Sequence, residues 1–241
     1  MNPLIQTTSK LFYGKWPFKL SCICKGSWMV KRLGIPKTIE FCLIQQYPAR
    51  NTWGGLCVSP NTNKDELLAF SNAVESFLDK EIQIRVQGST FNIYCKDAAL
   101  FQEMISALAT WAYEIHKPAN DVEHQFLDNS TKVVLCNHLP FKQYSFKVYI
   151  KSTTPASVRD NFKSWITHYD SKIRTPNHTV KWFDKGSGWG IGFYDPIIYV
   201  KDQSTLVMIG LFLGSNIQKV EEFIPRSSIN TSTDQEQTCH L

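Results

Sequence analysis

Two stretches of the chain, 128 residues apart, share one pattern and decide the fold: Leu11-Phe-Tyr-Gly-Lys-Trp-Pro-Phe-Lys-Leu20 and Leu139-Pro-Phe-Lys-Gln-Tyr-Ser-Phe-Lys-Val148. Both read Leu, any residue, aromatic, two variable residues, aromatic, any residue, Phe, Lys, aliphatic. A second pair follows in the same order, Ile93-Tyr-Cys-Lys-Asp97 and Ile198-Tyr-Val-Lys-Asp202, with four of five positions identical. Two matched pairs in one order indicate an internal repeat.

The two copies predict the same order of secondary-structure elements. Apolar residues at helical spacing predict a helix at 64–78, with Asn63 in the N-cap position. Gly88 and Ser89 predict a hairpin turn, while Asp97 and Asp202 precede helical segments. In the first copy we expect strands at 18–24, 82–86, 91–96 and 131–136, a helix from 98 to about 116, and an additional strand at 38–46. In the second copy we expect strands at 145–151, 179–183, 197–201 and 217–224, with helices at 155–169 and 203–214.

This βαββαβ order is the split βαβ arrangement of the ferredoxin-like fold. We therefore predict an α+β protein made of two tandem ferredoxin-like units, which form a divergent internal repeat. The first unit is expected to span 1–137, with an insertion at about 27–62, and the second to span 138–225. Residues 226–241 are rich in Ser, Thr and Gln and are expected to form a disordered tail.

The composition indicates a globular protein with packed cores. The chain has 241 residues, of which 43% are hydrophobic and 13% aromatic. No apolar run approaches the roughly 18–20 residues of a membrane span, and the N-terminus has no hydrophobic core of a secretory signal. Seven cysteines at irregular spacing argue against a disulfide framework. We expect an intracellular, cytoplasmic protein without membrane contact.

The charge is unevenly distributed along the chain. Residues 1–63 hold eight basic residues and one acidic residue, a net charge of +7, and residues 136–226 hold twelve and seven, a net charge of +5. Between them, residues 64–135 hold six basic and eleven acidic residues, a net charge of −5. This pattern favours an anionic partner at the two basic blocks, although a merely solvated surface would look the same.

Strand alternation gathers lysines and tyrosines on the sheet face away from the helices. In the second copy the expected outward residues are Lys147, Tyr149, Lys151, Tyr199 and Lys201, and the inward ones are Tyr144, Phe146, Val148, Ile150, Ile198 and Val200. The first copy keeps Lys19, Ser21, Lys25, Tyr94 and Lys96 on this face. The placement resembles that of RNA-recognition-motif domains, although their short RNP signatures are absent.

Aromatic rings stack on bases while lysines contact phosphates, so we expect noncatalytic binding of RNA or single-stranded DNA, without a cofactor. Exposed tyrosines and lysines would equally suit a protein partner. A protein-interaction or assembly role is therefore the alternative, and an RNA endonuclease is the third interpretation. Oligomeric state does not follow from the sequence.

A glycine-rich segment, Lys185-Gly-Ser-Gly-Trp-Gly-Ile-Gly192, lies between two expected strands. Its backbone N–H groups and Lys185 could contact phosphate while Trp189 stacks on a base. The competing interpretation is a long twisted hairpin, or a packing role for Trp189. It is not a dinucleotide-binding fingerprint, because no helix follows it.

Two histidines are the candidate catalytic residues. His168 ends an expected helix and His178 opens an expected strand, and a metal-independent ribonuclease needs such an imidazole. A favourable interaction with the helix dipole explains His168 more simply. The tandem plan with a glycine-rich loop also resembles CRISPR repeat-processing RNA endonucleases, but their loop follows the last helix. Cys22-x-Cys24 and Cys136-x-His138 would lie on neighbouring strands, but the cysteines share the inward parity of the core, so we expect buried thiols and no metal.

Overall fold

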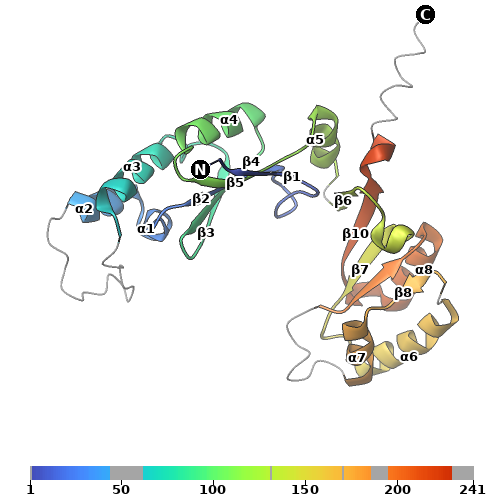
Figure 1. Ribbon diagram of the computed structural model, residues 1–241. Coiled ribbons are helices and arrows are strands. Elements are labelled where there is room, and N and C mark those ends of the chain that lie inside the picture. The colour runs from blue at the N-terminus through green and yellow to red at the C-terminus, as the bar shows by residue number, and fades with distance from the viewer. Residues whose placement is uncertain (1, 44–61, 131, 170, 186–194, 230–241) are drawn as a thin grey trace, which may run out of the picture. The chain divides into compact units, whose positions relative to one another are not determined.

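The computed structural model describes residues 2–43, 62–130, 132–169, 171–185 and 195–229 (Figure 1). The chain divides into two compact units, Met1–Thr131 and Lys132–Leu241. Each unit contains one five-stranded sheet, with helices packed on one face. The protein is therefore an α+β protein of two ferredoxin-like units, as predicted. Within the described ranges, no helix is both long enough and apolar enough to cross a membrane.

The first unit is a ferredoxin-like sheet with one additional edge strand. The βαββαβ core consists of strands β2, β3, β4 and β5 with helices α3 and α4. With β1 added at one edge, the strand order across the sheet is β1-β5-β2-β4-β3. The edge strand β1 runs parallel to β5. The elements are β1 (Leu4–Thr7), β2 (Phe18–Ile23), α1 (Trp28–Leu33), α2 (Ile35–Leu43), α3 (Lys64–Glu75), β3 (Ile82–Gln87), β4 (Thr90–Cys95), α4 (Ala98–Ala107), β5 (Ala112–Lys117) and α5 (Asp121–Asp128).

The second unit repeats this plan, edge strand included. Its sheet has the order β6-β10-β7-β9-β8, and β6 runs parallel to β10 as β1 does to β5. Helices α6, α7 and α8 cover one face and supply its core (Figure 1). The elements are β6 (Val133–Cys136), η1 (Pro140–Lys142), β7 (Phe146–Ile150), α6 (Ala156–Ile166), η2 (Thr167–Tyr169), β8 (Ile173–Arg174), α7 (Asn177–Lys185), β9 (Ile197–Val200), α8 (Gln203–Leu213), η3 (Gly214–Asn216) and β10 (Ile217–Pro225).

Strand register confirms that the two units are equivalent. Phe18 pairs with Cys95 in the first sheet, and Phe146 pairs with Val200 in the second. One residue further on, Lys19 pairs with Tyr94 and Lys147 pairs with Tyr199. These are the residues that the two sequence motifs match to each other, so the repeat holds at the level of individual backbone pairs.

The helix starts follow the predicted caps. The Asn63 side chain accepts hydrogen bonds from the backbone N–H groups of Asp65 and Glu66, and Asp97 accepts one from Leu100 at 2.6 Å. Asp202 caps α8 in the same way. These side chains satisfy backbone donors that have no partner inside the helix.

Two predicted elements of the first copy are wrong. The stretch 38–43 lies in helix α2, because Ile35, Thr38, Ile39 and Cys42 fall on one buried or half-buried face at helical spacing; positions 44–46 lie outside the described residues. The helix after Asp97 ends at Ala107 instead of near His116. Residues 112–117 form β5, which pairs with β1 on one side and with β2 on the other. Pairing on both edges outweighs the local helix propensity of this stretch.

The strand expected at 131–136 also has a different role, because β5 already forms the last core strand of the first sheet. This segment is β6, and it pairs with β10 of the second sheet rather than closing the first. In the second copy, 179–183 is helical in α7 rather than a strand. Thr179, Trp182 and Phe183 are buried at i, i+3 and i+4, the spacing of a helix face. The partner of β9 is instead the short β8.

The chain beyond β10 continues in regular structure for one turn. Residues 226–229 are helical and Ile229 is buried. The rest of the expected tail lies outside the described residues, as do residues 186–192 of the glycine-rich segment, including Trp189.

Candidate functional site

The face of the second sheet away from the helices carries the expected lysine and tyrosines. Phe146, Val148 and Ile150 point into the core and are at most 7% exposed. Lys147 and Tyr149 alternate with them in β7 and are half-buried on the opposite face. Tyr199 of β9 is half-buried beside Lys147, its backbone partner.

Lys147 lies over two aromatic rings. Its Nζ is 4.6 Å from the ring centroid of Tyr149 and 6.0 Å from that of Tyr199. Distances of this size allow cation–π attraction, which orients the ammonium group along the sheet surface. The face therefore presents a cation held between two rings.

A buried carboxylate of β10 fixes one of these rings. The Tyr149 hydroxyl donates a hydrogen bond of 2.8 Å to Oε2 of Glu221, and Lys219 Nζ lies 2.6 Å from Oε1 of the same carboxylate. Burial, followed by the contact with Glu221, raises the pKa of Tyr149. The tyrosine hydroxyl therefore stays protonated and remains a donor at neutral pH.

The segment that leads into β7 adds aromatic residues to the same face. The Phe141 ring meets Tyr199 edge-on, with centroids 5.1 Å apart, and the Arg174 guanidinium carbon lies 3.9 Å from the Phe141 centroid. Tyr144 also contacts Phe141 and Tyr199, at 6.1 and 6.4 Å. The expectation that Tyr144 points inward with the core was wrong, because its residue precedes the strand and its ring turns to the other face.

In the first unit the equivalent face is covered. Tyr94 is only 5% exposed, because Phe12 and Tyr13 pack on its ring at 5.5 and 5.2 Å. Trp16 is 4% exposed and its Nε1–H donates to Gln83 Oε1 at 2.7 Å. The prediction that Tyr94 lies on an open surface was therefore wrong. The chain's own aromatic segment occupies the surface where a base would stack.

The first face is also neutralised. Lys19 Nζ is 3.1 Å from Glu114 Oε2, with both side chains 17% exposed. His116 Nε2 lies 3.1 Å from the same oxygen. Burial would raise the pKa of Glu114, but the close contacts with His116 and Lys19 lower it overall. Lys19 thus has an ionised partner, which makes it a poor phosphate ligand.

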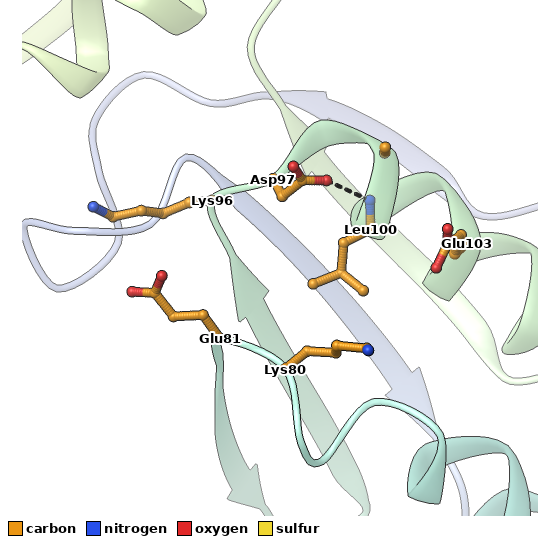
Figure 2. Close-up of a pocket in the computed structure, with 7 residues that line it drawn as sticks. Lys80, Glu81, Lys96, Asp97, Leu100 and Glu103 are labelled. Atoms are coloured by element: carbon orange, nitrogen blue, oxygen red, sulfur yellow. Dashed lines mark hydrogen bonds between the residues drawn. The ribbon is translucent and has the colours of Figure 1, made fainter.

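The remaining predicted lysines lie beyond the strand ends. Lys151 and Lys201 are exposed and follow the last residues of β7 and β9, and Lys25 is exposed two residues after β2. Lys96 follows β4 and lines a shallow hollow near the start of α4 (Figure 2). Lys185 ends α7. Among the first four, whose side chains the structure describes, none lies over two aromatic rings as Lys147 does.

The hollow of Figure 2 does not have the charge of a phosphate site. Two lysines, Lys80 and Lys96, face three carboxylates, those of Glu81, Asp97 and Glu103. Asp97 caps α4, as the dashed line to Leu100 shows. The carboxylates would repel a polyanion, so the hollow is not part of the candidate site.

The two candidate histidines lie in different helical elements of the second unit. His168 lies in η2, where its Nδ1 is 3.1 Å from the Ser164 carbonyl oxygen, consistent with a helix-end contact. His178 is exposed in α7 and does not open a strand. The two residues have no contact with each other among the interactions of the described chain.

The two cysteine-containing pairs belong to different sheets. Cys22 lies in β2, whereas Cys136 lies in β6 of the other sheet, so the expected strand neighbourhood was wrong. Burial raises the pKa of the Cys22 and Cys24 thiols to about 12, which keeps both protonated. In the described ranges, no group of three or more His, Cys, Asp or Glu residues could hold a metal ion.

Sequence reasoning missed the residues that approach the faces from outside the strands. They are Phe12, Tyr13, Trp16, Arg85, Phe141, Tyr144 and Arg174. A signal was present, since the two motifs each place aromatic residues directly before a strand.

No family model, no curated protein and no solved structure matches this chain.

Proposed function

We propose that this protein binds single-stranded nucleic acid, RNA or DNA, without catalysis, through the face of its second sheet. The observation that carries the proposal is the position of Lys147 over Tyr149 and Tyr199. A cation set among rings offers a phosphate contact beside stacking surfaces, the combination that single-stranded nucleic acid requires.

Differences between the two units support the second as the binding unit. In the first, Phe12 and Tyr13 cover Tyr94, which is only 5% exposed. In the second, Tyr149 and Tyr199 remain partly exposed, and residues 136–226 carry a net charge of +5 from twelve basic and seven acidic residues. Ring faces are accessible only in unpaired bases, so a duplex should bind less well.

The test is a titration of fluorescently labelled single-stranded RNA and DNA with wild-type protein and with Lys147→Gln. We expect the variant to bind every sequence more weakly and the slope of log K against log salt to fall by roughly one, because one phosphate contact is lost. Lys181→Gln is the matched control. Lys181 is an exposed lysine on α7, which packs on the core side of the same unit.

Equal losses in both variants would mean that general charge, not this face, drives binding. Unchanged affinity in Lys147→Gln would contradict the proposal directly. The melting temperature of each variant is measured alongside, so that a loss of affinity is not mistaken for a loss of folding.

A second function, assembly with another copy of the chain, is favoured by helix α8. Its outer side exposes Leu211 at 78%, Val207 at 51% and Met208 at 44%. Gly210 sits among them, and a Cβ there would meet nothing within 4 Å, so another backbone could approach closely. Because one patch contacts its own copy in a twofold dimer, such a face can be self-complementary.

Sedimentation equilibrium separates this role from nucleic-acid binding. If α8 mediates assembly, Leu211→Asp should convert a concentration-dependent dimer into a monomer without loss of folding. A wild-type protein that stays monomeric at high concentration would rule out this second function.

A further inference from the structure

The two turns before β2 and β7 share an unusual backbone. Tyr13 and Phe141, which the repeat matches, have φ of +55° and +51°, and the residues after them, Gly14 and Lys142, have φ of +68° and +67°. A bulky residue with positive φ is rare and costs free energy. The same conformation at the same two positions of both copies indicates that the aromatic residue is kept for something other than turn formation.

The positive φ at Tyr13 and Phe141 leaves each aromatic ring partly exposed to solvent. Tyr13 is 52% exposed and Phe141 is 50% exposed, although each contacts a strand tyrosine below it. Tyr13 meets Tyr94 at 5.2 Å and 83°, and Phe141 meets Tyr199 at 5.1 Å and 80°. Each ring therefore packs edge-on against a strand tyrosine, and about half of the residue's surface is exposed to solvent.

Each displayed ring has a guanidinium beside it. The Arg174 carbon lies 3.9 Å from the Phe141 centroid, within stacking distance, while the Arg85 carbon lies 5.8 Å from the Tyr13 centroid. Arg85 also donates a hydrogen bond of 2.6 Å to the Tyr13 hydroxyl. The two arginines come from β8 and β3, the equivalent edge strands of the two sheets.

Neither guanidinium has a carboxylate partner among the described residues. Arg174 thus offers planar donors to a phosphate while its flat side covers an aromatic ring. An exposed ring beside a guanidinium that has no carboxylate partner in the described part of the chain suits a base and its phosphate. Arg85 is committed to the Tyr13 hydroxyl, so the second unit again presents the more available pair.

We propose that Phe141 and Arg174 form the base-binding contact of this protein, in which an unpaired base stacks on the pair and Arg174 binds its phosphate. This inference rests on the proposed function, and it transfers the stacking role from the strand tyrosines to the turn. Tyr199 then acts as the support that orients Phe141, and Lys147 continues the phosphate track. Tyr13 and Arg85 are the weaker counterpart in the first unit.

The probes are short single-stranded RNA and DNA oligonucleotides that contain one 2-aminopurine, whose fluorescence falls when it stacks on a ring. Phe141→Ala should weaken binding by about 5- to 150-fold without changing the salt slope, because stacking is not ionic. It should also restore the fluorescence. Phe141→Trp should retain both affinity and quenching. Arg174→Gln should lower affinity and salt slope together.

Controls separate stacking from folding. Val180→Ala removes an exposed apolar side chain, 40% exposed, from α7 on the helix side of the unit, and its affinity should equal that of the wild type. Phe141→Gly should melt at or above the temperature of Phe141→Ala, because glycine accepts positive φ, yet it should bind no better. If the glycine variant recovered wild-type affinity, the ring would not be the ligand contact.

The outcomes distinguish this inference from the function beneath it. If Lys147→Gln weakens binding while Phe141→Ala does not, the sheet face binds nucleic acid and the stacking inference is wrong. Failure of the wild-type protein to bind either RNA or DNA would overturn both.

Discussion

Trp16→Ala tests whether the segment before β2 covers one face of the first sheet. The indole is 4% exposed, and its Nε1–H bonds Gln83 across the face. Truncation of a buried Trp costs about 3–5 kcal/mol, a range that includes the effect of leaving the Gln83 oxygen without its donor. Tyr13→Ala, in the same segment but 52% exposed, should cost less than about 1 kcal/mol.

The assay is urea unfolding combined with hydrogen exchange read by mass spectrometry. Protection should fall in β2, β3 and β4 of the first unit and stay unchanged in the second. Nucleic-acid affinity should also stay within a factor of two of wild type, as a rough bound, because the proposed binding face lies on the second unit. If Trp16→Ala and Tyr13→Ala cost the same small amount, the segment does not cover the sheet and Tyr94 is accessible after all.

Two further predictions concern pH. Because burial and Glu221 raise the pKa of Tyr149, its neutral form stabilises the fold below the unfolded pKa of about 10, and this contribution is lost as pH rises; Tyr149→Phe should flatten the alkaline fall in the urea midpoint. The pH dependence of Glu114 has the opposite sign. Burial would raise its pKa, but the contacts with His116 and Lys19 together lower it from 4.5, so its contribution to stability is present above that pH and is lost on acidification. Glu114→Gln should flatten the acid limb of the same midpoint curve, and an unchanged limb would contradict the assigned pairing.

The fold could be predicted from the sequence because the repeat motifs and the helix caps are local sequence patterns. The motif pairs at Phe18 and Phe146, and at Tyr94 and Tyr199, fixed the repeat, and the caps at Asn63 and Asp97 fixed two helix starts. These features depend on a few neighbouring residues, so a single sequence is enough to find them.

The errors occurred where tertiary pairing decides. Residues 112–117 look helical beside α4, but a slot between two strands makes them β5. The same misassignment forced 131–136 into the first sheet. In α7, Thr179 and Phe183 also fit a strand's alternation over so short a window, and only burial of Trp182 shows the helical face.

The candidate site was half readable for a related reason. Alternation places Lys147, Tyr149 and Tyr199 correctly, because it is a property of the strand itself. Whether a face is open depends on segments that cross it. Trp16 and Phe141 cross their faces through turns with positive φ, and aromatic residues give no sequence signal for that conformation.

Photochemical crosslinking tests the central claim most directly, because it shows where nucleic acid lies on the folded protein. A single-stranded RNA containing thiouridine would be bound, irradiated and mapped by mass spectrometry. We predict crosslinks in the segment around Phe141 and in strands β7 and β9, at residues such as Tyr149 and Tyr199. Crosslinks confined to α6, α7 and α8, or to the first unit, or none above background, would contradict the account.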